Sequence, residues 1–162
     1  MIILGIDPGT ARVGWGIVRE EKGKVTADNF GCIETKPHQE LAIRLKEIYD
    51  KIMILIQQEK PNALAIEEIY FTNNAKTVIS VAQSRGIVLL AAAQTATPVI
   101  SYTPLVVKQT ITGNGRADKS QVQFMITKLL HLSSQPTLDD TSDALAIALT
   151  HAYSYRMNNQ LR

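Results

Sequence analysis

Four carboxylates in this sequence combine the residue type and the placement that metal-ion chemistry requires. Asp7 ends the apolar segment IILGID, and Glu67 ends the apolar segment ALAIE. An ionised carboxylate at the end of a buried strand is costly unless it is paired or bound to a metal ion. Far along the chain, Asp140 and Asp143 are spaced i, i+3, which places them on one face of a helix. If the apolar sequence ALAIALTHAY docks that helix on the sheet, the four carboxylates meet at one end of it.

Carboxylates brought together in this way need a counter-charge. Two of them ~4 Å apart repel by ~4 kcal/mol at an effective dielectric constant of 20. Hard oxygen ligands without cysteine favour Mg²⁺, with Mn²⁺ as a substitute, over zinc. Two such ions per site can hold both the attacking and the leaving oxygen of a phosphoryl displacement.

The charge distribution agrees with a substrate that carries phosphate. The whole chain has a net charge of +2, which alone identifies no partner. Residues 101–135 contain four basic side chains against the single acidic Asp118, and Asp139, Asp140 and Asp143 follow directly. A basic segment beside an acidic cluster suits a phosphate-bearing substrate and a metal ion. The alternative is a solvated helix face followed by an aspartate-rich helix start.

Each carboxylate also has a purely structural interpretation. Asp7, before Pro8 and Gly9, fits an Asx-turn. Glu67 fits a surface ion pair with a lysine or arginine. Asp140 fits a helix N-cap, with Asp143 as the carboxylate of its first turn.

Hydrophobic periodicity and turn residues predict the elements that position these residues. Strands are expected at 2–7, 13–19, about 25–35, 63–67 and 98–102. Helices are expected at 38–59, about 75–95, 119–130 and 141–155, with a short helical turn at 104–111. The first three strands form an antiparallel meander, and the first, fourth and fifth are parallel because helices separate them. The predicted fold class is therefore α/β, with a mixed five-stranded sheet flanked by helices.

Length and composition exclude several classes of protein. A chain of 162 residues fits one domain, expected at 1–156, followed by a tail at 157–162 that we expect to be disordered. No apolar run reaches the ~18 residues that a membrane span needs. Cys32 is the only cysteine, so disulfide frameworks and thiolate zinc sites are excluded. A single cysteine suits the reducing cytoplasm, where we expect the protein to act.

The predicted helix at 75–95 is apolar on more than one face. Its sequence VISVAQSRGIVLLAAA exceeds what covering a sheet requires. Either the helix is deeply buried, or its second face meets another copy of the chain.

Five sequence blocks occur in an order that is specific to one nuclease family. They are GIDPGT (5–10), AIEE with YFTNNAKT (65–77), QSRG (83–86), VKQTITGNGRADKSQV (107–122) and DDTSDALAIALTHA (139–152). From Ile2 to about Tyr153 the chain resembles the RuvC Holliday-junction resolvases. The resemblance implies a ribonuclease-H-like fold and a homodimeric, Mg²⁺-dependent endonuclease that nicks two strands of like polarity across a four-way DNA junction. It also implies the RuvA–RuvB branch-migration complex as a partner.

The resemblance assigns site residues by position. The acidic residues of the family fall on Asp7, Glu67, Asp140 and Asp143, with Glu68 and Asp139 as neighbouring alternatives. The aromatic residue that stacks at the junction falls on Tyr70, with Phe71 as the alternative. Lys108 and Lys119 match the family's basic residues near the cleaved strand; otherwise they would be ordinary surface lysines.

Other functions remain open from the sequence. GIDPGT is also similar to the phosphate loop of actin-like ATPases, but those enzymes need two such domains. A YqgF-like nuclease of the ribonuclease-H fold, acting in RNA processing, is the nearer alternative. A junction-binding protein without catalysis is the third, although the complete carboxylate set argues against it.

Overall fold

The structure is a computed structural model that describes residues 1–69 and 75–160. The strands are β1 (Ile2–Asp7), β2 (Arg12–Glu21), β3 (Lys24–Glu34), β4 (Ala63–Glu67) and β5 (Val99–Tyr102). The helices are α1 (Leu41–Glu59), α2 (Ala75–Gln94), α3 (Pro104–Thr112), α4 (Lys119–Leu129) and α5 (Asp139–Gln160). Tyr70 and Phe71, the aromatic residues assigned to the junction, lie outside the described residues.

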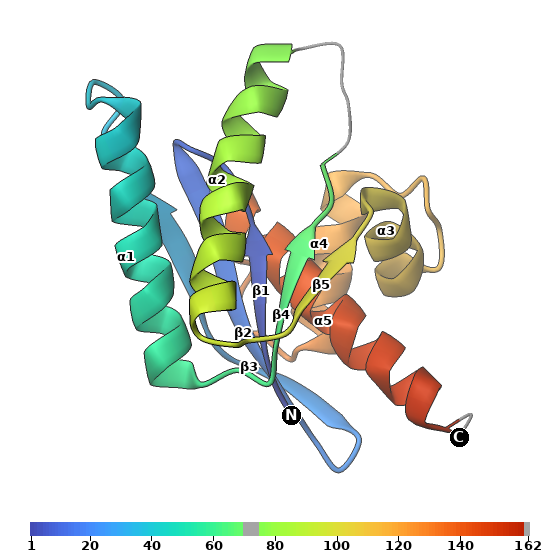
Figure 1. The fold of residues 1–162 in the computed structure, drawn as a ribbon. Helices are drawn as coiled ribbons and strands as arrows, with labels where there is room; N and C mark the ends of the chain where they lie inside the picture. Colours follow the sequence, from blue (N-terminus) through green and yellow to red (C-terminus); the bar gives the residue numbers. More distant parts are fainter. Residues whose placement is uncertain (70–74, 161–162) are drawn as a thin grey trace.

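The five strands form one mixed sheet in the order β3-β2-β1-β4-β5 (Figure 1). β1 pairs with β2 and β2 with β3 in antiparallel fashion, whereas β1 pairs with β4 and β4 with β5 in parallel. This arrangement confirms the predicted sheet, with the meander at one edge. The carboxyl ends of β1, β4 and β5 consequently meet at one end of the sheet.

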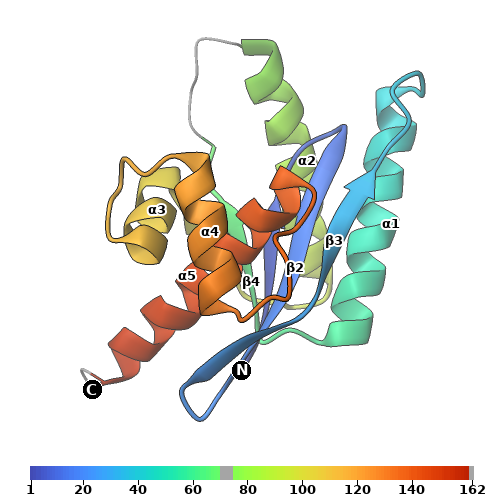
Figure 2. The same cartoon turned by 180° about the vertical axis from the view of Figure 1, so that it is seen from behind.

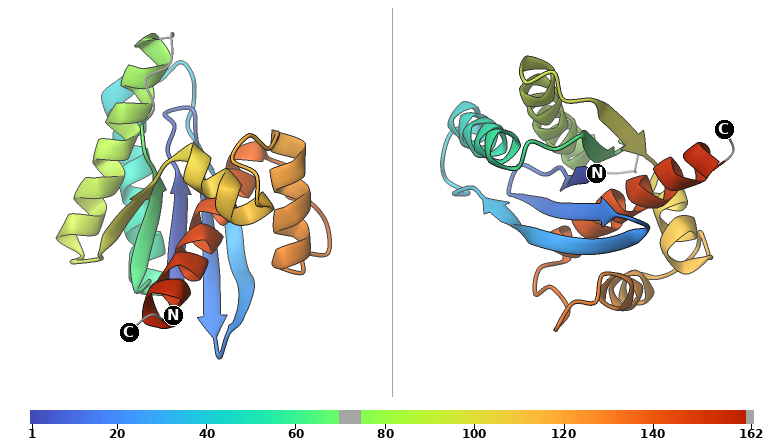
Figure 3. Two further views of the ribbon diagram at one scale, coloured as in Figure 1. Left: turned by 90° about the vertical axis from the view of Figure 1, so that its right-hand side faces the viewer. Right: turned by 90° about the horizontal axis from the view of Figure 1, so that it is seen from below.

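Helices cover both faces of the sheet, as the views in Figures 2 and 3 show. On one face, Ile48, Ile52 and Ile56 of α1 and the apolar side of α2 pack on β1, β2 and β4. On the other face, α5 crosses β1 and β2, and α3 and α4 pack against it. Burial of each large aliphatic side chain contributes about 2 kcal/mol, so both layers stabilise the sheet.

Three glycines let α5 approach the sheet closely. A Cβ atom built on Gly14 of β2 would lie 1.8 Å from the carbonyl oxygen of Asp140, and one on Gly5 of β1 would lie 2.1 Å from that of Ala144. A Cβ atom on Gly16 would lie 2.7 Å from a methyl carbon of Leu145. Any other residue at Gly14 or Gly5 would therefore displace the helix backbone.

The observed helices differ from the predicted ones mainly at their ends. α5 begins at Asp139, two residues before the predicted start, so Asp140 lies in its first turn and is not its N-cap. α5 also continues to Gln160, whereas the domain limits of 1–156 and 157–162 stay a prediction. The turn predicted at 104–111 is the complete helix α3. Among the helices described here, none combines the length and apolarity that crossing a membrane requires.

Candidate active site

Two of the four carboxylates lie at the ends of neighbouring parallel strands. The register between β1 and β4 pairs Gly5 with Ala65 and Ile6 with Ile66. The next residue in β1 is Asp7 and the next in β4 is Glu67, and each is the last residue of its strand. The fully buried Ile6 and Ile66 anchor the two strand ends in the core, so the carboxylates leave the sheet side by side.

The other two carboxylates come from the first turn of α5. The close contact between Gly14 and the backbone of Asp140 sets the position of this turn against β2. The hydroxyl of Thr141 also donates a hydrogen bond of 3.1 Å to the carbonyl oxygen of Gly31 in β3. The start of α5 is thus fixed to the sheet from two strands, and Asp140 and Asp143 are carried to the strand ends.

The four carboxylates act on one another electrostatically. Burial and, after it, the negative charges of Glu67, Asp143 and Asp140 together raise the pKa of Asp7 from 3.8 to about 8. Burial, followed by the charge of Asp143, raises the pKa of Glu67 from 4.5 to about 7. Burial likewise raises the pKa of Asp143. Lys119 lowers each of these three pKa values, but burial and the neighbouring negative charges outweigh it, so all three stay raised.

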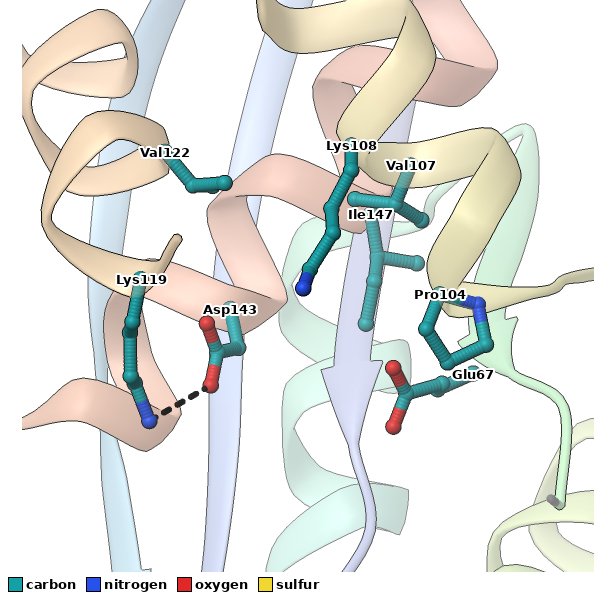
Figure 4. A pocket seen from close by; sticks show the side chains of 8 residues that line it. All are labelled: Glu67, Pro104, Val107, Lys108, Lys119, Val122, Asp143 and Ile147. Atoms are coloured by element: carbon teal, nitrogen blue, oxygen red, sulfur yellow. Dashed lines mark ion pairs between the residues drawn. The ribbon is translucent and has the colours of Figure 1, made fainter. Parts of the chain in front are cut away.

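A pocket of about 190 Å³ opens between Glu67 and Asp143 (Figure 4). Its walls also include Lys108 and Lys119, together with Pro104, Val107, Val122 and Ile147. The side chain of Lys108 points into the space between the two carboxylates. The pocket therefore combines two negative and two positive groups on an apolar floor.

Helix caps hold the two lysines in place. Thr103 caps α3, Pro104 is the first residue of that helix, and Val107 is buried beside Lys108. Asp118 caps α4 by accepting a hydrogen bond of 2.9 Å from the backbone nitrogen of Gln121, whose side chain accepts one in return. This capping box fixes the first turn of α4, where Lys119 is the first residue.

Two basic side chains neutralise the carboxylates of α5. Lys119 Nζ lies 3.1 Å from Asp143 Oδ2 and 3.2 Å from Asp139 Oδ2. Arg12 Nε lies 3.1 Å from Asp140 Oδ2, an oxygen that is buried but makes no well-aligned hydrogen bond. The ion pair therefore balances charge at Asp140 but leaves the lone pairs of this oxygen without a donor.

The ligand chemistry of the site fits a hard divalent cation. All four candidate ligands are carboxylates, and a nearby cation would relieve the repulsion that raises their pKa values. As the side chains stand, however, no group of three Asp, Glu, His or Cys residues in the described ranges 1–69 and 75–160 is arranged to hold an ion. We therefore expect ion binding to turn Asp140 away from Arg12 or Asp143 away from Lys119.

The structure separates the two pairs of neighbouring acidic residues. Glu68 is exposed, and its backbone nitrogen donates to the carbonyl oxygen of Tyr102. The side chain of Asp139 is 59% exposed and accepts a hydrogen bond from Gln123. Glu67 is more buried than Glu68, and Asp140 is more buried than Asp139.

Sequence reasoning missed two arginines at this end of the sheet. Arg12 pairs with Asp140, and Arg85 of α2 donates a hydrogen bond to the backbone of Glu67. Arg12 could have been found from its place at the start of the strand after the Pro8-Gly9 turn. Arg85 lies in the QSRG block, but its role depends on the strand register.

Comparisons with known proteins identify one family. Residues 3–151 match the family described as crossover junction endodeoxyribonuclease RuvC. The curated RuvC of Syntrophomonas wolfei is 49% identical over 161 residues, which cover 99% of this chain and 94% of that protein. The solved structure of Thermus thermophilus RuvC superposes with a TM-score of 0.90 at 35% identity, covering 98% of this chain and 97% of that one. T. thermophilus RuvC in complex with Holliday junction substrate superposes with a TM-score of 0.92 at 34% identity, covering 98% and 96%.

Proposed function

Because the chain belongs to the RuvC family of crossover junction endodeoxyribonucleases, we propose that it resolves four-way DNA junctions by cutting two strands of like polarity. The observation that carries this proposal is the cluster of mutually repelling carboxylates beside two lysines at the carboxyl end of the parallel strands. A relative of 34% identity has been solved with a Holliday junction substrate, which supports the choice of substrate. The family match leaves the YqgF-like alternative without support.

The proposed site uses Asp7, Glu67, Asp140 and Asp143 to hold divalent metal ions, Mg²⁺ or Mn²⁺ and two per site. When bound, such ions would activate a water molecule and offset charge on the departing 3′ oxygen. Asp7 and Glu67 are suited to ion binding because their burial makes the ionised form unfavourable without a cation. The pairing of the α5 carboxylates with Arg12 and Lys119 keeps that part of the site charge-balanced before ions bind.

The lysines act on the DNA strand in this proposal. Lys108 points into the pocket and can approach a phosphate that lies between Glu67 and Asp143. Lys119, once Asp143 turns to a metal ion, keeps only its exposed pair with Asp139 and can turn toward a phosphate oxygen. Positive charge there stabilises the additional negative charge that develops in the transition state. Tyr70 stays the proposed stacking residue on the basis of the family pattern.

We also propose that two chains pair through α2. Ile79 and Leu90 are 58% and 48% exposed on this helix. Ala82, Gly86 and Ala93 lie between and beside them on the same face, and a Cβ atom on Gly86 would touch nothing within 4 Å. The small residues leave room for a second helix at close range, and a two-fold axis there would supply two sites for two symmetric cuts. The RuvA–RuvB complex and a cytoplasmic location stay predictions from family and composition.

The experiment that tests this function uses a synthetic four-way junction. The protein is incubated with the junction, with linear duplex DNA and with RNA, each with Mg²⁺ and with a chelator. We expect paired nicks in the junction with Mg²⁺ and none in the other arms, and Asp7→Asn should bind the junction without cutting it. Equal cleavage of RNA, or cleavage by Asp7→Asn, would contradict the proposal.

A further inference from the structure

The side chain of Arg85 connects helix α2 to the strand ends that carry the site. Its Nε donates a hydrogen bond of 3.1 Å to the backbone carbonyl oxygen of Glu67, at the end of β4. Its terminal nitrogen Nη2 donates a hydrogen bond of 2.7 Å to Ser101 Oγ in the neighbouring strand β5. The planar guanidinium holds both acceptors at fixed relative positions because its donors cannot rotate independently.

The carbonyl oxygen of Glu67 lacks the donor that the sheet would normally supply. The backbone nitrogens of Leu64 and Glu68 donate to Pro98 and Tyr102, so these residues of β4 face β5. Successive residues of a strand direct their backbone groups to opposite sides, so Glu67 faces β1. Continuing the parallel register past the Ile6–Ile66 pair places the nitrogen of residue 8 opposite this carbonyl. Residue 8 is proline, which has no N–H to donate.

Buried residues and a hydrogen bond fix the part of helix α2 that carries Arg85. Ser84, directly before it, is fully buried, and so are Val88, Ala91 and Ala92 one to two turns later. The hydroxyl of Ser80, one turn earlier on α2, forms a hydrogen bond with the hydroxyl of Thr10, which follows Asp7 by three residues. Polar side chains of α2 therefore form hydrogen bonds near both carboxylate-bearing strand ends, to the Thr10 hydroxyl after β1 and to the Glu67 backbone in β4.

We infer that Arg85 is a positioning residue that replaces the missing donor at Pro8 and thereby fixes the direction in which Glu67 leaves β4. This inference rests on the proposed function, in which Glu67 binds a metal ion. A carbonyl left without a donor would draw water or rotate, and the rotation would turn the adjoining side chain away from Asp7. Arg85 thus acts on the ion only through the backbone of Glu67.

The first test concerns the metal-free protein and requires no catalysis. The backbone nitrogen of Glu68 donates to the carbonyl oxygen of Tyr102 at 2.8 Å, and its hydrogen exchange reports opening of this end of β4. In Arg85→Gln we expect exchange of the Glu68 amide to become at least roughly tenfold faster, while the amides of β2 and β3 keep their rates. Arg19→Gln, at the opposite end of the sheet, is the matched control and should leave the Glu68 amide unchanged. Unchanged exchange in Arg85→Gln would overturn the inference.

The second test measures binding of Mn²⁺ by calorimetry. Loss of a group that orients a metal ligand typically weakens metal affinity by about 10–100-fold. We expect such a loss in Arg85→Gln, a smaller one in Arg85→Lys, which can reach one acceptor but not both, and the smallest in Ser101→Ala. Junction affinity in chelator should stay within about twofold of the wild-type value for all three. If all variants bind Mn²⁺ as the wild type does, the inference is wrong.

A separate variant distinguishes failure of the inference from failure of the proposed function. Glu67→Gln removes the ligand itself and should weaken Mn²⁺ binding more than Arg85→Gln does. Wild-type Mn²⁺ affinity in Glu67→Gln would refute the metal role of Glu67, whereas the exchange rate of the Glu68 amide would still decide whether Arg85 holds this strand end.

Discussion

Replacement of Asp7 by asparagine should stabilise the metal-free protein, and only at neutral to alkaline pH. Burial and the neighbouring carboxylates raise the pKa of Asp7 from 3.8 to about 8 in the folded chain. Between these two values the folded state binds a proton that the unfolded state releases, so the free energy of unfolding falls as pH rises. Asparagine resembles the protonated acid in shape and does not titrate. The advantage of Asp7→Asn should therefore be small at pH 4.5 and largest at pH 8.5.

The magnitude follows from the two pKa values. The interval from 3.8 to about 8 corresponds to an upper limit of about 6 kcal/mol at 1.36 kcal/mol per pH unit. The pKa of Glu67 is raised to about 7, so Glu67 also holds a proton over part of this pH range and then repels Asp7 less. Because the two coupled carboxylates share the cost of ionisation, we expect Asp7→Asn to raise the free energy of unfolding by roughly 2–3 kcal/mol at pH 8.5. For a chain of this size, that gain raises Tm by roughly 4–12 °C.

The assay is thermal unfolding in chelator and in Mg²⁺ at the two pH values. Mg²⁺ should raise the Tm of the wild type at pH 8.5 but raise that of Asp7→Asn much less. Asp50→Asn is the matched control, because Asp50 is an exposed aspartate of α1 paired with Lys46 at 2.6 Å. It should cost about 0.5 kcal/mol or less. If Asp7→Asn is no more stable than the wild type at pH 8.5 in chelator, or gains equally at both pH values, the electrostatic account of the cluster is refuted.

Three further predictions concern the helices around the site. Gly14→Ala should lower the free energy of unfolding by about 2 kcal/mol or more in denaturant titrations, because its Cβ atom would lie 1.8 Å from the carbonyl oxygen of Asp140. A loss below about 0.5 kcal/mol would contradict the close packing of α5 on β2. Lys119→Met should slow single-turnover cleavage by roughly 100-fold while junction affinity changes only a few-fold, and equal losses in both would assign Lys119 to binding alone. Burial lowers the pKa of His151, whose ring forms a hydrogen bond of 2.8 Å with the hydroxyl of Tyr102. As pH drops below about 6.5, the unfolded chain binds a proton at His151 before the folded chain does, so the free energy of unfolding falls. His151→Gln should remove this part of the acid sensitivity, as read from Tm between pH 7.5 and 5; an unchanged slope would exclude His151 as its source.

The sheet and the approach of the four carboxylates could be predicted because they depend on patterns that persist along the chain. Apolar segments ending in Asp7 and Glu67 specify two strands, and the antiparallel hairpin and single helix between them favour parallel pairing. The spacing of Asp140 and Asp143 specifies one helix face whatever the exact start of α5. These features follow from hydrophobic periodicity and connection rules, which a single sequence contains.

Individual side-chain contacts could not be predicted in the same way. The pairing of Arg12 with Asp140 depends on how closely α5 seats on Gly14, a distance that no pattern in the sequence sets. The bond from Arg85 to the carbonyl oxygen of Glu67 becomes understandable only when the strand register places Pro8 opposite that oxygen.

Anomalous diffraction from crystals of the protein soaked in Mn²⁺ would show directly whether carboxylates that are far apart in the sequence bind the same cations at one end of the sheet. We expect anomalous peaks between Asp7, Glu67 and the aspartates of α5, with Asp140 or Asp143 turned away from its basic partner. Full Mn²⁺ occupancy elsewhere on the molecule, with no peak at these four side chains, would contradict it.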